Sequence, residues 1–403
     1  MYRWRSRECR NYKSSIRNRE GIWQEMKWEL LNDDQRALLI KVKNYTDEVI
    51  SVNYQKYEIS GEFPYPLFQE ICHLGVFELL KQENNNDDLT FFECIRIIAS
   101  GFPALASIVL TQGSYIIYPL LQFGNHEQQN KFLKDLMTGH KIGGLALTEP
   151  DHGSDIAGGL ATTAERKGDK WILNGEKRWI GGADTADIVP VFARDVEDGK
   201  IKCFIVRKGA PGYKADPVPQ KISLRCVQNG HITMENVEVP DADRLPNING
   251  FKDVARILIH TRADVAHIAT GVTGGAYKAA LKYTTERDQF DRKVAGFQLV
   301  QEKLSRMLAN TTAAISFSVR IAELMEAGEY EMFNSSLAKM SNSLRMRETV
   351  SLARETCGGN GITLETDVAR FFADAEAVYT YEGSHEVNAL IVGREITGMG
   401  AFV

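Results

Sequence analysis

The sequence lacks the features that would assign it to three specialised classes of protein. We find no apolar run approaching the ~20 residues needed to cross a bilayer, so we expect no membrane span. Its six cysteines include no CxxC pair, which favours reduced thiols and predicts neither a disulfide frame nor a metal site. The formal net charge of −5 argues against binding nucleic acid without sequence preference, which needs clustered cations. The 403 residues suffice for an ordinary globular protein of two or three domains.

Proline is absent from the last part of the chain. All eleven prolines lie at or before Pro246. Because an interior proline costs a helix ~3 kcal/mol, the remainder suits a helical domain. Apolar residues recur every three or four positions over 265–283 and again over 300–319, as one helix face requires. A third periodic segment, around 337–344, is followed by Gly358-Gly359, a typical helix stop.

Between about residues 143 and 247 the pattern changes to short β-rich runs separated by turn-forming residues. Asn174-Gly175 is a hairpin signal within this region. The runs that we expect to form strands are 160–164, 171–173, 188–193, 201–206 and 232–239. Residues 24–140 again indicate helices, so the chain is predicted to be α+β, in the order helical, β, helical.

The two ends of the chain bear on localisation. The first 19 residues contain many cationic side chains and Glu8 as the one acid. Such a start resembles a mitochondrial presequence, with a disordered basic tail or an overlong gene start as alternatives. The final residues, Gly400-Ala-Phe-Val, are not a peroxisomal tripeptide. We therefore expect the mitochondrial matrix if the protein is eukaryotic, and the cytoplasm otherwise.

Two segments of the β region could hold a flat ligand. The loop 145–155 reads LALTEPDHGSD, and its hydroxyls and backbone amides could bind the edge of a heteroaromatic ring; a capped turn is the alternative. The segment 173–182 contains Trp179, which is either a core residue or a wall for an aromatic ligand.

Three further segments lie in the helical region. Arg287-Asp-Gln-Phe290, followed by Gln298, suits a pyrophosphate or is a solvated cationic helix end. Cys357–Gly361 is a glycine-rich turn that could admit an adenine or phosphate, a weak signal by itself. Glu382 lies among tyrosines in an expected turn between helices, where it is either half-buried with a raised pKa or simply exposed.

Taken together, these segments resemble the acyl-CoA dehydrogenase/oxidase family over about residues 30–400. The closest resemblance is to glutaryl-CoA dehydrogenases and plant short-chain acyl-CoA oxidases. The family's Thr-Glu-Pro-x-x-Gly-Ser-Asp, Asn-Gly-x-Lys-x-Trp-Ile, Arg-x-Gln-Phe, Gly-Gly-Asn-Gly and Tyr-Glu-Gly blocks occur here in order and at family spacing. The resemblance implies a basic extension (1–23), an N-terminal helical domain (24–142), a middle β-barrel-like domain (143–247) and a C-terminal four-helix bundle (248–403).

The resemblance also implies FAD as cofactor, acyl-CoA as substrate and a homodimer or homotetramer. Glu382 would be the general base that removes the α-proton, while hydride passes from the β-carbon to the flavin. The residues implied around the flavin ring are Leu145, Leu147, Thr148, Ser154, Trp179, Ile180 and Gly181. Those implied elsewhere on FAD, in the family largely from a neighbouring subunit, are Arg287, Gln289, Phe290, Gln298, Glu355, Gly358, Gly359 and Ser384. Ser154, Arg262 and Gly383 are implied to contact the substrate.

Three departures from the family pattern qualify these expectations. Gly181 stands where dehydrogenases usually have a threonine, as in the plant oxidases. Thr261 stands where some relatives carry the base, which supports Glu382. Ala106 stands where glutaryl-specific enzymes place an arginine, which disfavours a dicarboxylic substrate.

With these departures, the resemblance implies a short-chain acyl-CoA dehydrogenase that forms a trans-2-enoyl-CoA and passes electrons to an electron-transferring flavoprotein. A short-chain oxidase that reduces O2 to H2O2 is the alternative. A flavin-containing scaffold and a plain CoA-binding module are rivals from other classes, and the intact Glu382 argues against the scaffold.

Overall fold

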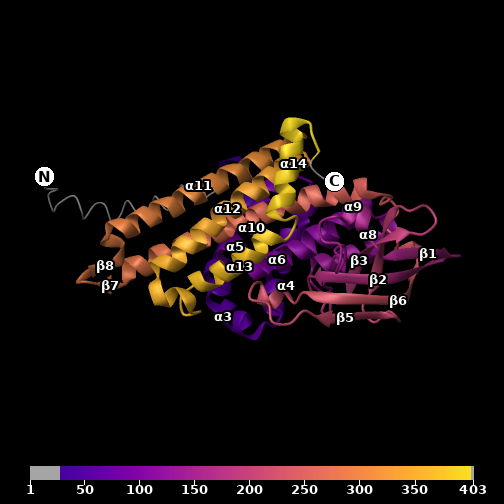
Figure 1. Cartoon of the computed structure of the whole chain (residues 1–403), viewed down its shortest axis with the longest axis horizontal. Helices are drawn as coiled ribbons and strands as arrows, with labels where there is room; N and C mark the ends of the chain where they lie inside the picture. Colours follow the sequence, from indigo (N-terminus) through magenta and orange to yellow (C-terminus); the bar gives the residue numbers. More distant parts are fainter. Residues whose placement is uncertain (1–27, 401–403) are drawn as a thin grey trace.

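The computed structural model describes residues 28–400. The basic extension and the final tripeptide considered above lie outside these residues. Within them a helical region is followed by a sheet and then by long helices, as Figure 1 shows, so the predicted α+β order is confirmed.

The first region consists of helices that pack on one another. α2 and α8 begin at capping boxes, in which Asn32 with Gln35 and Asn125 with Gln128 satisfy backbone amides of the first turn. The elements are η1 (Trp28–Leu30), α2 (Asp33–Tyr45), η2 (Thr46–Ile50), α3 (Ser51–Ser60), α4 (Tyr65–His73), η3 (Val76–Lys81), α5 (Asp87–Gly101), α6 (Pro103–Gln112), η4 (Gly113–Ile117), α7 (Tyr118–Phe123) and α8 (His126–Met137).

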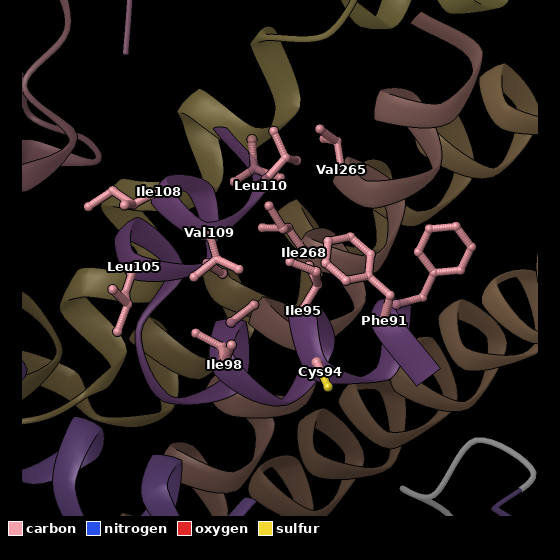
Figure 2. Close-up of a cluster of buried hydrophobic side chains, with 14 of the residues drawn as sticks. Phe91, Cys94, Ile95, Ile98, Leu105, Ile108, Val109, Leu110, Val265 and Ile268 are labelled. Carbon is pink, nitrogen blue, oxygen red and sulfur yellow. The ribbon is translucent and has the colours of Figure 1, made fainter. Parts of the chain in front are cut away.

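One continuous stretch of this region, Pro103–Phe123, is long and apolar enough to cross a membrane. The expectation that no apolar run approaches this length is therefore wrong. The most apolar window of this stretch is 83% buried inside the protein, as in a core helix. Figure 2 shows Val109 of α6 in one cluster of buried apolar side chains with Ile98 of α5 and Ile268 of α10.

The second region is a six-stranded sheet in the order β4-β3-β1-β2-β6-β5. Neighbouring strands are antiparallel except β1 and β3, which are parallel. The elements are α9 (Ile156–Gly159), β1 (Thr163–Lys167), β2 (Lys170–Ile180), β3 (Ile188–Asp195), β4 (Ile201–Arg207), β5 (Tyr213–Pro217), η5 (Arg225–Val227), β6 (Gly230–Pro240) and η6 (Asp241–Asp243).

Two details of the sheet differ from the sequence prediction. Asn174-Gly175 lies inside β2 at a register shift against β6 and forms no hairpin turn. A Cβ on Gly175 would lie 2.8 Å from the Cα of Thr162, so close approach of another segment explains the glycine. Strand β5 was not predicted, because its burial alternates weakly along a polar sequence.

The third region contains the long helices, two of which flank Glu382. They are α10 (Phe251–Glu286), α11 (Gln298–Glu326), α12 (Met332–Thr356), α13 (Val368–Thr380) and α14 (His385–Thr397), with the short elements β7 (Asp288–Gln289), β8 (Arg292–Lys293), η7 (Val294–Gly296) and η8 (Gly358–Ile362). α10 packs against α5, α11, α12 and α13, and this packing brings helices from both ends of the chain together.

Glycines in α10 allow this close packing. A Cβ on Gly271 would lie 2.3 Å from the backbone oxygen of Arg96 in α5. A Cβ on Gly275 would lie 2.6 Å from the backbone oxygen of Ser100. Gly274, by contrast, has room for a side chain, with its nearest neighbour at 3.8 Å.

Candidate active site

Glu382 lies in the short turn between α13 and α14, where the sequence placed it. Its φ is +57°, a left-handed conformation that is uncommon for a residue with a side chain, and Gly383 follows with φ +79°. The next residue, Ser384, caps α14 by accepting a hydrogen bond from the amide of Val387 at 3.3 Å. Ser384, predicted to bind the cofactor, therefore uses its hydroxyl for a helix cap.

The carboxyl group of Glu382 is half-buried and is held by two hydroxyl groups. The Tyr115 hydroxyl of η4 donates to Oε1 at 3.2 Å, and the Thr261 hydroxyl of α10 donates to the same oxygen. Burial raises the pKa of Glu382, while nearby Arg262 and the two hydrogen bonds partly offset this shift. A carboxyl with a raised pKa at such a junction suits a general base.

Arg262 lies beside this turn and is almost completely buried. A Cβ on Gly383 would lie 3.4 Å from its Nε, so the guanidinium packs directly against the turn. Its Nη1 donates to Met332 and, at 3.5 Å, to Ser336, whereas Nε has no partner among residues 28–400. Burial lowers the pKa of Arg262, whose charge lies close to the Glu382 turn.

A buried ion pair, which was not among the predicted site residues, holds the loop 145–155. Lys177 donates from Nζ to Glu149 at 2.8 Å and to the backbone oxygen of Leu147 at 3.1 Å. Glu149 also accepts hydrogen bonds from the amides of Ala161 and Thr162. Burial lowers the pKa of Lys177 to about 8. Both residues lie inside motifs already recognised, the Thr-Glu-Pro and Asn-Gly-x-Lys blocks, so the motifs themselves were the signal.

The exposed side of this loop has the features of a cradle for a flat ring. The hydroxyls of Thr148 and Ser154 make no hydrogen bond to any residue in the described part of the chain. The amide of Arg178 donates a hydrogen bond to the backbone oxygen of Thr148 at 2.9 Å, which joins this loop to β2. The next residue, Trp179, has φ +67° and is 53% exposed, so it is not a core residue. Leu147 and Ile180 are buried behind it.

Gly181 continues this wall and lines a cavity of about 10 Å³. Thr111, Gln112 and Val227 line the same cavity, which has room for about one water molecule. A Cβ on Gly181 would lie 3.5 Å from the Thr111 hydroxyl oxygen and 3.6 Å from Val227, both ordinary contacts. The site therefore has space for a side chain where family dehydrogenases usually carry one.

The second predicted group of FAD residues lies elsewhere on the molecule. Arg287 ends α10, and Gln289 and Phe290 belong to the β7–β8 hairpin, which Figure 1 shows at the end of the helices far from the sheet. The whole group is exposed: Arg287, Gln289, Phe290, Gln298, Glu355, Gly358 and Gly359. One chain therefore does not bring the two groups together, and their union across subunits stays a prediction.

The donor sets fit FAD. Exposed Trp179 and the free hydroxyls of Thr148 and Ser154 can receive a flavin ring, and exposed Arg287 with the amides of Gln289 and Gln298 can receive a pyrophosphate. A helical, β and helical fold with such a cradle and a half-buried carboxyl on an inter-helix turn defines a flavin-dependent oxidoreductase.

Comparison with known proteins agrees with this class. Models of the acyl-CoA dehydrogenase N-terminal, middle and C-terminal domains match residues 32–140, 144–237 and 249–397. The caffeyl-CoA reductase-Etf complex subunit CarC of Acetobacterium woodii is 32% identical over 87% of this chain and 93% of its own length.

Two solved structures are similar over most of both chains. A glutaryl-CoA dehydrogenase from Mycobacterium smegmatis in complex with FADH2 is 30% identical, with a TM-score of 0.87, covering 94% of this chain and 98% of that one. Butyryl-CoA dehydrogenase from Megasphaera elsdenii is 28% identical, with a TM-score of 0.85, covering 91% and 98%. The chain belongs to the acyl-CoA dehydrogenase family and is an FAD-dependent oxidoreductase.

Proposed function

We propose that this enzyme oxidises a short-chain acyl-CoA to the trans-2-enoyl-CoA, with Glu382 as the base, and delivers the electrons to an electron-transferring flavoprotein. The observation that carries the proposal is the half-buried Glu382 carboxyl, held by Tyr115 and Thr261 beside the buried cation Arg262. No other carboxyl in the recognised motifs lies on the turn that the family uses for its base.

The residues of this chain would divide the work as follows. Glu382 removes the α-proton, and its raised pKa strengthens it as a proton acceptor at neutral pH. The amide of Glu382 forms no hydrogen bond within residues 28–400, so it can donate to the thioester oxygen as negative charge develops. Arg262 would stabilise the CoA side through the positive charge of its buried guanidinium. When bound, FAD supplies the oxidising chemistry by accepting the hydride of the β-carbon.

The acceptor and the substrate class rest on different support. A. woodii CarC is by its name a subunit of a complex with an electron-transferring flavoprotein, and we propose the same kind of partner here. The similar M. elsdenii enzyme acts by name on butyryl-CoA, which supports a short acyl chain. Ala106, at the position of the glutaryl-binding arginine, is fully buried and uncharged, so we propose a substrate without a distal carboxylate.

Oxidase activity is the second candidate, because Gly181 lines a cavity with room for a small molecule. That space could admit oxygen to the reduced flavin. The rate at which the reduced flavin is reoxidised in air measures this access and separates the two candidates.

The test is anaerobic bleaching of the bound flavin by a panel of acyl-CoAs, for the wild type and Glu382→Gln. We expect butyryl-length substrates to bleach the wild type fastest. We expect Glu382→Gln to retain FAD and to bleach ~10²–10⁴-fold more slowly, as for a positioned base. Bleaching of the variant at the wild-type rate would refute the assignment of Glu382. Rapid recovery of colour in air would favour the oxidase.

A further inference from the structure

A lysine that has no part in the reaction above lies against the turn that carries Glu382. Lys339 of α12 has no solvent-exposed surface. Its Nζ donates to the backbone oxygen of Tyr379 at 2.7 Å and to that of Gly383 at 2.8 Å. Within residues 28–400 no carboxylate oxygen lies within ion-pair distance of this ammonium. The buried charge is therefore directed at two carbonyl groups that lie on either side of Glu382.

Burying the Lys339 ammonium without a carboxylate partner costs free energy, which suggests that the residue has a role. Taking an ammonium out of water costs several kcal/mol unless other groups replace the lost hydration. Two carbonyls give a partial replacement, and the Tyr379 ring, 6.0 Å from Nζ, adds a cation–π contact. Burial lowers the pKa of Lys339 to about 7, whereas the charge of Glu382 opposes this shift.

The turn between the two carbonyls is one that the chain would not adopt unaided. Glu382 and Gly383 are consecutive left-handed residues, and a non-glycine residue in this region costs about 1–3 kcal/mol. Tyr379 lies in the last turn of α13, where backbone oxygens lack helical partners. Gly383 also accepts a hydrogen bond from the Asn388 side chain at 2.8 Å. The strained residue is thus enclosed between two anchored carbonyls.

We propose that Lys339 is a positioning residue for the base: its ammonium joins the Tyr379 and Gly383 carbonyls and so holds the left-handed backbone that aims Glu382. This inference rests on the proposed role of Glu382. Tyr115 and Thr261 orient the carboxyl group through their hydroxyls, whereas Lys339 holds the backbone of the turn that carries this group.

Lys339 also acts on Glu382 by its charge. The charged and titratable groups around it are Glu382 on the turn, Arg262 on α10, and Glu386 on α14. His385 stacks on the Tyr379 ring, and Arg347 lies over that ring at 4.4 Å. Because the Lys339 ammonium lowers the pKa of Glu382, removal of the charge should raise that pKa. The effect on this pKa should be smaller than for a direct ion pair.

The experiment compares Lys339→Met, Lys339→Gln and Lys339→Arg in the holoenzyme. Methionine keeps the length of the side chain but removes both hydrogen bonds and the charge. Glutamine keeps donors without the charge, and arginine keeps both. Arg347→Met is the matched control, because Arg347 is an exposed cation of the same helix that contacts α13 through side chains alone. FAD content, thermal melting, the bleaching rate and its dependence on pH are measured for each variant.

We expect Lys339→Met to bind FAD and substrate normally and to bleach about 10–100-fold more slowly, since a misplacement of ~1 Å can cost 10²-fold. In its pH–rate profile, the acidic limb, where the rate falls as Glu382 is protonated, should move to higher pH. Glutamine should restore part of the rate but not the limb, arginine should restore part of both, and Arg347→Met should stay within about threefold of the wild type. If Lys339→Met does not fold, Lys339→Gln carries the test through its displaced limb.

A wild-type rate and an unmoved limb in Lys339→Met and Lys339→Gln would overturn the inference. An equal loss of rate in Arg347→Met would also overturn it. Glu382→Gln, measured beside them, separates this failure from failure of the proposed function. If Glu382→Gln is inactive while Lys339→Met is normal, only the role of Lys339 is refuted.

Discussion

Burial raises the pKa of Glu382, and the hydrogen bond from Thr261 partly offsets this rise, an effect that can be measured. Thr261 donates to Oε1, and a donor to a carboxylate stabilises the charged form and lowers its pKa. Thr261→Val keeps the shape of the side chain and removes the donor. The pKa of Glu382 should therefore rise further above its ordinary value.

The size of the shift follows from the strength of the lost bond. A hydrogen bond to a charged group contributes about 1.5–3 kcal/mol, and the lower end applies because the carboxyl is only half-buried and Tyr115 still donates. At 1.36 kcal/mol per pKa unit, the shift is about one unit. The base works as the carboxylate, so its reactive fraction falls with pH through the pKa. The variant should lose about tenfold in kcat/KM below both pKa values and little well above them.

The assay is the pH dependence of kcat/KM with an artificial electron acceptor, for the wild type, Thr261→Val and a control. Thr273→Val is the matched control, because Thr273 is a buried threonine of the same helix whose hydroxyl donates to the Ala269 oxygen. Its acidic limb should not move. An unmoved limb in Thr261→Val, with normal folding and FAD content, would show that the hydroxyl does not control the base.

Three further outcomes are expected. Arg287→Ala should yield apoprotein and a weakened oligomer together, since FAD bound only by the assembled form stabilises it; a monomeric holoenzyme in sedimentation would contradict this. Gly181→Thr should fold, because its Cβ meets only ordinary contacts, and should slow reoxidation of reduced flavin in air; slow reoxidation in both proteins would remove the case for an oxidase. Glu149→Gln should lose FAD and about 3–5 kcal/mol of stability, because it leaves Lys177 as an unpaired buried charge; an unchanged melting temperature would refute this.

Local patterns were sufficient to predict the order of the three regions and the position of Glu382 in a turn. A proline-free, periodic tract can be predicted to form helices because helix formation and the apolar face of a helix depend on residues three or four positions apart. The same local reasoning failed at Asn174-Gly175, where the glycine is required by the close approach of Thr162 and not by a turn. It failed again at Pro103–Phe123, whose apolar surface is covered by other helices.

The surroundings of Glu382 could not be predicted in this way. Tyr115, Thr261 and Lys339 are far from Glu382 along the chain and come from three separate helices. None of them belongs to a recognised motif block, and a lone buried lysine or threonine has no local signature.

The sequence alone therefore determined the family, the type of cofactor and the identity of the candidate base, because each depends on short motifs with a set spacing. Only the tertiary structure decided which groups hold that base and tune its pKa. Hydrogen bonding and desolvation act over a few ångströms in space, and the packing of α10 and α12 against the turn brings those groups within reach.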